Sequence, residues 1–292
     1  NQLAEIPAEI GNLHALKILK LDSNKLQRLP ITIGDMHSLQ ELNLNCNDIW
    51  ELPDEITLLA ALRRFLMSWN KVFELPDDFG ELKHLEYFEM FGNKLTVLPH
   101  SFCQLKRLDM LMLRENKLHE IGVWIDGLLS LKHCDLSRNA IKEVLPNVGT
   151  CLKLQELHLN HNNITDLPRE LGRCTSLERL HIHHNRIEVF RDEFAGMRML
   201  KHLDAGFNSI GPTLPAEFGL LNQLITIDLS HNRLEEIPPN VGALKRVEEL
   251  YLHGNALATI PSSVVDLDHL RKLNLSRNRM TTLLGLPLED MK

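Results

Sequence analysis

Apolar residues alternate with polar ones over short stretches that recur along the chain at a near-constant spacing. In each stretch two apolar residues stand five and three positions before an asparagine, as Leu42 and Leu44 stand before Asn47. This alternation predicts a short strand with one face in the core. Further apolar positions follow two and five residues after the asparagine, where Ile49 and Leu52 stand. Each repeat therefore predicts one strand, an inward turn at the asparagine, and a return segment.

The asparagine sets the period of the repeat. It recurs every 23 residues, except for one interval of 24 between Asn208 and Asn232. Because its amide has both donors and acceptors, a column of buried asparagines can satisfy the backbone groups that each turn frees. We therefore expect a structural asparagine ladder formed by Asn24, Asn47, Asn70, Asn93, Asn116, Asn139, Asn162, Asn185, Asn208, Asn232, Asn255 and Asn278.

A fixed period of this length predicts a solenoid, since one repeat cannot bury its apolar face alone. The connections are too long for hairpins, so successive strands must pair in parallel. Prolines such as Pro30 and Pro53 favour an extended or short helical return segment, and pairs such as Ile33-Gly34 predict a helical turn closed by a glycine cap. The expected fold is an α/β solenoid, a curved horseshoe with a parallel sheet on its concave face and short helical or extended segments on its convex face.

We expect one domain over residues 1–292, with about 12–13 repeats. Both ends lie within a repeat, so the chain is expected to be a segment of a longer protein. The proline is missing or displaced after Asn116, Asn139 and Asn185, which predicts more helix in this middle region. The 24-residue repeat from Asn208 reads NSIGPTLPAEFG and is interpreted either as a surface bulge or as a hinge or contact site.

The repeat LxxLxLxxNxLxxLPxxIGxL resembles the 23-residue leucine-rich repeat over essentially the whole chain. Its LPxxIG version resembles the intracellular Ras-linked group, which includes Scribble, Erbin, the scaffold that joins Ras to a phosphatase, plant relatives of that scaffold, and the repeat domain of fungal adenylate cyclase. This resemblance implies a non-catalytic signalling scaffold that binds a partner protein such as a small GTPase or a phosphatase. Two alternatives remain open: a recognition domain of a larger cyclase, kinase or ubiquitin ligase, and a structural subunit of a ciliary or cytoskeletal assembly.

Side chains six, four and two positions before each ladder asparagine point away from the core, and we call them the open sheet face. They are free of the packing pattern, so a partner is expected to bind there. In its first half, apolar and aromatic residues gather beside arginines, a composition typical of a protein-binding hot spot. The alternative is that large neighbours only cover one another. The candidate residues are Arg64, Leu66, Trp69, Tyr87, Glu89, Phe91, Met110, Met112 and Arg114.

The second half of the open sheet face is rich in histidine and carboxylate. Its candidate residues are Asp135, His158, His181, His183, Asp204, Asp228 and Tyr251. Three interpretations compete: a solvated polar surface, a pH-sensitive recognition surface, and a zinc site at His158, His181 and Asp204. Zinc requires a tetrahedron of ligands, and a row of side chains on parallel strands fits one poorly. We therefore predict neither a metal site nor a cofactor.

Composition and motifs exclude several other functions. The net charge of −7 disfavours a nucleic-acid partner, which requires a basic surface. No apolar run is long enough to span a membrane. The five cysteines are odd in number and scattered, which favours a reducing, cytoplasmic location. No nucleophile elbow or glycine-rich phosphate loop is present, so an enzyme is not expected.

Overall fold

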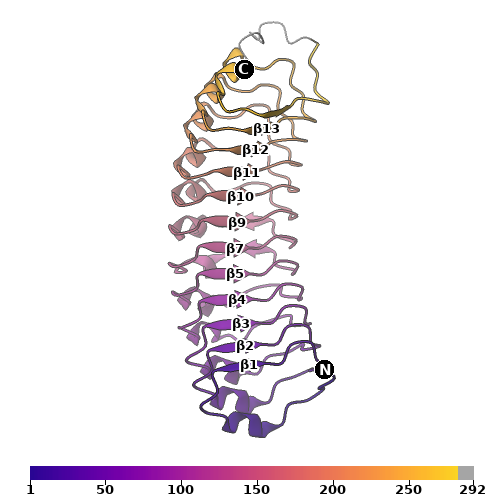
Figure 1. Ribbon diagram of the computed structural model, residues 1–292, viewed down its shortest axis with the longest axis vertical. Helices are drawn as coiled ribbons and strands as arrows, with labels where there is room; N and C mark the ends of the chain where they lie inside the picture. The colour runs from indigo at the N-terminus through magenta and orange to yellow at the C-terminus, as the bar shows by residue number, and fades with distance from the viewer. Residues whose placement is uncertain (282–292) are drawn as a thin grey trace. The chain divides into compact units, whose positions relative to one another are not determined.

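The computed structural model describes residues 1–281, so the partial repeat at residues 282–292 lies outside the described residues. The chain divides into two compact units, Asn1–Ile141 and Lys142–Lys292, which we call the N-terminal and C-terminal units. A single domain over the whole chain stays a prediction. Within each unit, short strands are stacked one beside the next, with short helices at one end of each repeat and tight turns at the other (Figure 1).

The N-terminal unit holds a parallel sheet whose strands follow one another in chain order. Leu42 pairs with Leu19 on one side and with Phe65 on the other, each 23 residues away, so the repeat period becomes the strand register. This confirms the predicted parallel solenoid. The strands are β1 (Ile18–Lys20), β2 (Glu41–Asn43), β3 (Arg64–Leu66), β4 (Tyr87–Glu89), β5 (Met110–Met112) and β7 (His133–Asp135), and a separate short strand is β6 (Glu120–Ile121).

The C-terminal unit repeats this arrangement. Leu180 pairs with Leu157 and with Leu203 in the same in-register way. The 24-residue repeat does not interrupt the sheet, because Leu203 pairs with Ile227 and the extra residue lies in the return segment. The strands are β9 (Glu156–His158), β10 (Arg179–His181), β11 (His202–Asp204), β12 (Thr226–Asp228), β13 (Glu249–Tyr251) and β14 (Lys272–Asn274), and β8 (Glu143–Val144) is a further short strand.

The return segments form short 3-10 helices. Most begin directly after a proline, whose ring fixes φ near −68°, as at Pro53. In the N-terminal unit they are η1 (Ala8–Asn12), η2 (Ile31–Asp35), η3 (Asp54–Leu58), η4 (Phe79–Glu81), η5 (His100–Gln104) and η6 (Val123–Ile125). In the C-terminal unit they are η7 (Pro146–Thr150), η8 (Arg169–Arg173), η9 (Asp192–Gly196), η10 (Ala216–Leu220), η11 (Pro239–Ala243) and η12 (Ser262–Asp266).

Two expectations about these helices are wrong. The middle repeats contain no more helix than the others, since η6 has 3 residues and η9 has 5. A buried apolar residue such as Phe194 anchors the turn there without a proline. Gly34 also does not cap η2, because it lies inside the helix. A Cβ atom on Gly34 would lie 2.6 Å from the carbonyl oxygen of Glu55, so this glycine allows neighbouring turns to approach closely.

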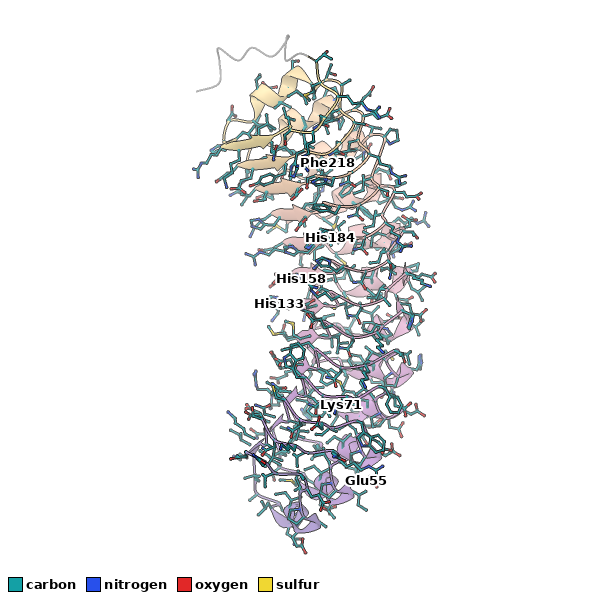
Figure 2. All side chains as sticks on the ribbon, turned by 90° about the vertical axis from the view of Figure 1, so that its right-hand side faces the viewer. Glu55, Lys71, His133, His158, His184 and Phe218 are labelled. Carbon is teal, nitrogen blue, oxygen red and sulfur yellow. The ribbon has the colours of Figure 1, made fainter. Side chains whose placement is uncertain are left out.

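The core of each unit fills the space between the strands and the 3-10 helices, as the side chains in Figure 2 show. In the N-terminal unit it contains a cluster of phenylalanines in place of leucines. Phe88 is fully buried, and its ring lies 5.7 Å from Phe65, 5.1 Å from Phe79 and 6.0 Å from Phe102 between centroids. The bulkier strand residues are therefore matched by bulky residues on the helical side.

The ladder asparagines bridge neighbouring repeats through hydrogen bonds. Asn70 Oδ1 accepts from the Ile49 N–H at 3.0 Å, and its Nδ2 donates to the Leu44 oxygen at 2.9 Å and the Met67 oxygen at 3.3 Å. One amide thus serves three backbone groups in three segments. The same pattern recurs at Asn47, Asn93, Asn116, Asn139, Asn185, Asn208, Asn232, Asn255 and Asn278.

The residue before each ladder asparagine adopts a left-handed backbone conformation. Trp69 has φ 56° and His184 has φ 52°, and Gly92 and Gly254 occupy the same position with φ of 68° and 70°. The Trp69 N–H donates to the Phe91 oxygen of the next repeat at 2.8 Å, which fixes the turn. Left-handed φ is a strong outlier for β-branched residues. The residues found here with positive φ other than glycine are Ser23, Cys46, Trp69, Glu115, Arg138, His161, His184, Phe207, His231 and Arg277, all unbranched at Cβ.

Candidate functional site

The open sheet face of the N-terminal unit contains a hollow of about 390 Å³, which we call the aromatic hollow. Its lining comes from β4, β5 and β7, from the turns that follow β4 and β5, and from the turn after β3. Most of its lining was singled out from the sequence, and the structure brings these side chains together. The lining residues are Trp69, Tyr87, Glu89, Phe91, Met112, Arg114, Glu115 and Asp135.

Trp69 forms an exposed wall of the aromatic hollow. Its side chain is 52% exposed and meets the Phe91 ring edge to face, with centroids 5.6 Å apart. The indole lies against Gly92, where an added Cβ atom would come within 2.5 Å of the ring. A glycine at this position therefore allows the indole to rest on the backbone, where Phe91 also contacts it.

Glu89 is a fixed carboxylate in the same lining. Its Oε2 accepts from the Tyr87 hydroxyl at 2.6 Å, and its Oε1 accepts from the Ser68 hydroxyl at 2.9 Å and from the Asn45 amide at 3.3 Å. Burial and the hydrogen bond to Glu89 raise the pKa of Tyr87 to about 12. The phenol therefore stays protonated at neutral pH and continues to donate to the carboxylate.

Three candidate residues lie outside this lining. The Arg64 guanidinium stacks over the Tyr87 ring, 4.3 Å from its centroid, and covers one side of it. Met110 pairs with Tyr87 across the sheet. Leu66 is separated from Met112 because Glu89 lies between them in the register, so the apolar surface is interrupted by a carboxylate.

Four residues that the sequence pattern did not single out also shape this site. Ser68 and Asn45 hold Glu89, Gly92 supports Trp69, and Glu115 adds a negative charge. A serine at an open-face position was the only signal in the sequence, and the structure shows that Ser68 is fully buried there. The orientation of its hydroxyl depends on the neighbouring strand, which the local sequence does not reveal.

The histidine-rich part of the C-terminal unit forms a connected cluster rather than a row of independent side chains. His158 Nε2 lies 2.9 Å from Glu156 Oε1, and the rings of His158 and His181 stack with centroids 4.4 Å apart. Asp204 Oδ2 lies 2.8 Å from His183 Nδ1 and 3.9 Å from His181 Nδ1. Figure 2 places His158 at the strand side of its unit. Imidazole rings and carboxylates are therefore in direct contact over these strands.

Asp204 is the most strongly perturbed group in this cluster. Burial raises the pKa of Asp204, but the adjacent His181 and His183 rings and the Gly206 N–H together lower it well below its ordinary range. The carboxylate is therefore ionised throughout the physiological pH range. It presents a fixed negative charge to both imidazoles.

The last two candidates on the open sheet face are held by local contacts. Asp228 Oδ1 accepts from the Ser230 N–H at 2.8 Å. The Tyr251 hydroxyl donates to Glu249 Oε2 at 2.9 Å, and this bond raises the pKa of Tyr251. Asp228 is the register partner of Asp204 on the neighbouring strand, and Tyr251 is in turn the register partner of Asp228.

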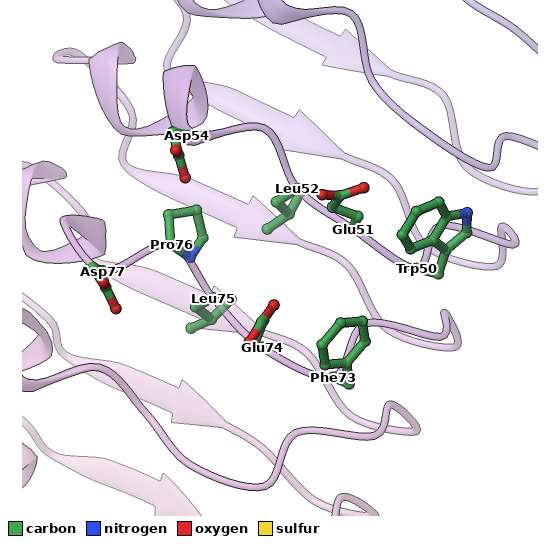
Figure 3. A pocket seen from close by; sticks show the side chains of 9 residues that line it. All are labelled: Trp50, Glu51, Leu52, Asp54, Phe73, Glu74, Leu75, Pro76 and Asp77. Atoms are coloured by element: carbon green, nitrogen blue, oxygen red, sulfur yellow. The ribbon is translucent and has the colours of Figure 1, made fainter.

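A second hollow in the N-terminal unit, of about 230 Å³, lies along the return segments (Figure 3). Trp50 and Phe73 stand at its turn end, while Asp54 and Asp77 stand near the 3-10 helices. Phe73 is 43% exposed. The lining combines two aromatic rings with the carboxylates of Glu51, Asp54, Glu74 and Asp77, so it matches a cationic surface.

The buried thiol of Cys174 is unsuited to nucleophilic chemistry. Burial raises the pKa of Cys174 to about 12, so about one thiol in ten thousand is ionised at pH 8. Cys46 is exposed. We expect iodoacetamide to alkylate native Cys46 at least about 100-fold faster than Cys174, as measured by peptide mass spectrometry over time. Equal rates in the folded protein would contradict the described burial, and unfolding in urea should remove the difference.

Comparison with protein families identifies the repeat. A model described as "Leucine rich repeat" matches residues 152–210 and 222–280, and a second model of the same description matches residues 35–49. These parts of the chain are leucine-rich repeats, and the chain has the leucine-rich repeat fold. No helix in the described residues is long and apolar enough to cross a membrane. Comparison with curated proteins gave no significant match.

Solved structures with the same fold include binding proteins. A leucine-rich repeat protein of Leptospira interrogans is 27% identical, with a TM-score of 0.60 over 96% of this chain and 88% of that one. The ectodomain of the Arabidopsis thaliana receptor kinase GASSHO1/SCHENGEN3, in complex with CASPARIAN STRIP INTEGRITY FACTOR 2, is 29% identical, with a TM-score of 0.74 over 94% and 37% of the two chains. The plant peptide hormone receptor RGFR1, in complex with RGF2, is 25% identical, with a TM-score of 0.76 over 95% and 54%. The leucine-rich repeat chain thus spans about a third to a half of those two receptor structures.

Proposed function

We propose that this leucine-rich repeat protein is a non-catalytic interaction module that binds a partner protein at the aromatic hollow. The observation that supports this most directly is the exposed Trp69 wall, held by Phe91 and Gly92 beside an apolar lining. Exposed aromatic side chains that are already ordered gain contact area at low entropic cost. The fold neighbours that were solved with peptide or protein ligands are consistent with such a role.

The charges around the hollow indicate the chemistry of its partner. Glu89, Glu115 and Asp135 line it with one basic residue, Arg114, which itself lies 3.0 Å from Glu115. The surface therefore fits an apolar anchor side chain that is flanked by basic residues.

The setting that we propose is a cytoplasmic signalling scaffold. Its support is the resemblance of the LPxxIG repeats to the Ras-linked group, whose partners include a small GTPase and a phosphatase. These two protein classes are therefore the first partners to test. A second candidate role is a structural subunit of a large assembly, which the acidic hollow of Figure 3 favours because it offers another contact surface on the same unit.

A triple variant tests the proposed function. Tyr87→Ser, Phe91→Ser and Met112→Ser remove most of the apolar lining, whereas the residues that form the core stay in place. We expect this variant to lose partner binding by at least about 100-fold, because truncating several hot-spot residues removes more than 3 kcal/mol. Binding should be measured by biolayer interferometry against a panel of purified small GTPases and phosphatases, and against partners captured from lysate and then purified.

The matched control is Leu58→Ser with Val97→Ser and Leu152→Ser, because these apolar residues are exposed outside the open sheet face. Circular dichroism must show that both variants retain the native spectrum. Equal loss in the control and the triple variant, or full binding by both, would refute the aromatic hollow as the docking site. A failure of the GTPases and phosphatases alone would refute only the proposed partner class.

A further inference from the structure

His181, His183 and Asp204 converge on one point of the open sheet face in the C-terminal unit. His181 and His183 lie two residues apart and project from the same face of the chain at β10, while Asp204 on β11 is the register partner of His181. Each of the three residues has one possible ligand atom, and these three atoms all lie within 4.8 Å of one another. His181 ends β10, His183 lies two residues beyond it, and Asp204 ends β11, so the three form a triangle. The zinc site considered from the sequence was instead a row of His158, His181 and Asp204 on three strands.

The dimensions of this triangle suit a tetrahedral ion. Ligands at about 2.0–2.2 Å from zinc lie about 3.4 Å from one another. Asp204 Oδ2 is 2.8 Å from His183 Nδ1 and 3.9 Å from His181 Nδ1, so the two distances bracket that value. Both distances to Asp204 are therefore close to the ligand spacing that a tetrahedral ion requires. The three side chains are 23–34% exposed, which leaves a fourth coordination position on the solvent side.

Surrounding contacts hold these side chains in place. The His181 ring stacks on His158 at an interplanar angle of 5°, and Asp204 Oδ1 accepts from the Gly206 N–H at 3.5 Å, which leaves Oδ2 directed at the histidines. The His183 ring meets the edge of His161 at 5.3 Å. Outer contacts of this kind orient metal ligands and raise metal affinity.

We propose that His181, His183 and Asp204 form a binding site for a divalent transition-metal ion, best suited to Zn²⁺, with one coordination position open to solvent. Two imidazole nitrogens and one carboxylate oxygen are a typical ligand set for zinc with an exchangeable fourth ligand. The neighbouring group of Glu156, His158 and His181 shares one histidine with this site, so a single ion is bound at a time. This site is independent of partner binding at the aromatic hollow.

Metal titration of the untagged protein tests the site. We expect isothermal titration calorimetry with Zn²⁺ to give one equivalent bound at micromolar protein concentration. Co²⁺ should give the intense visible absorption of a four-coordinate ion, which surface adsorption would not produce. His183→Gln and Asp204→Asn should each weaken Zn²⁺ binding by at least about tenfold, because each removes a ligand atom.

The matched control is His202→Gln on β11, which removes a histidine of the same surface that is not in the trio. It should bind Zn²⁺ as the native protein does, and circular dichroism should show that all variants are folded. Absence of stoichiometric binding, or equal affinity in the His183 and Asp204 variants and the native protein, would overturn the proposal. Loss of binding in His158→Gln with retention in His183→Gln would also overturn it, because the ion would then belong to the Glu156 group.

Discussion

Replacing Phe88 with alanine is expected to lower the free energy of unfolding of the N-terminal unit by about 3–5 kcal/mol. The Phe88 ring is fully buried and contacts Phe65, Phe79 and Phe102, which come from both the strand and the helical side of the core. Truncation removes apolar burial and also leaves a cavity, because the neighbouring rings are fixed by their own packing. Urea denaturation followed by circular dichroism measures the change.

Phe73→Ala is the matched control for this prediction. It is the same chemical change in the same unit, but Phe73 is 43% exposed at the acidic hollow. Its effect should stay below about 1 kcal/mol. If the two variants lost equal stability, the phenylalanine cluster could not be the centre of the core.

Replacing Asn70 with leucine should destabilise the same unit by a similar amount, about 3–5 kcal/mol, for a different reason. The change orphans the Ile49 N–H, which donates to Asn70 Oδ1 at 3.0 Å. It also removes the Asn70 donor from the Leu44 carbonyl, which then accepts only from Asn47 Nδ2 at 3.0 Å. An unsatisfied buried group costs about 1–3 kcal/mol and each further lost hydrogen bond about 1 kcal/mol. Hydrogen exchange should show faster exchange of the Ile49 amide in particular.

Asn12→Leu serves as the control for Asn70, since Asn12 is exposed at the end of η1. It should shift the urea midpoint very little. A native midpoint in Asn70→Leu, with the Ile49 amide still protected, would refute the structural role of the ladder.

Much of the fold was predictable because one period determines it. The pattern of Leu42, Leu44 and Asn47 recurs every 23 residues, and this period sets the strand register. The pairing of Leu42 with Leu19 and Phe65 follows from it directly. Local patterns with more than one physical explanation were less informative. An Ile-Gly pair is compatible with a helix cap or with close backbone approach, and only the position of Glu55 in the next repeat distinguishes them at Gly34.

The candidate site was predictable only in its residue positions. The sequence identified which side chains lie on the open sheet face, because they fall outside the packing pattern. It did not reveal that Glu89 interrupts the apolar surface, or that His183 rather than His158 lies beside Asp204. Both depend on side-chain rotamers and on contacts between adjacent strands, which a repeat pattern does not specify.

The left-handed residue before each ladder asparagine has a practical consequence. Its backbone is fixed by hydrogen bonds such as Trp69 N–H to the Phe91 oxygen, whatever side chain it bears. The described chain places an acid, bases, aromatic rings, a thiol and a hydroxyl at this one position. Exchanging one side chain that is unbranched at Cβ for another should therefore change the chemical groups at this edge of the sheet without changing the backbone fold. These left-handed positions therefore accept different unbranched side chains, and a binding surface of chosen specificity could be engineered by substituting them.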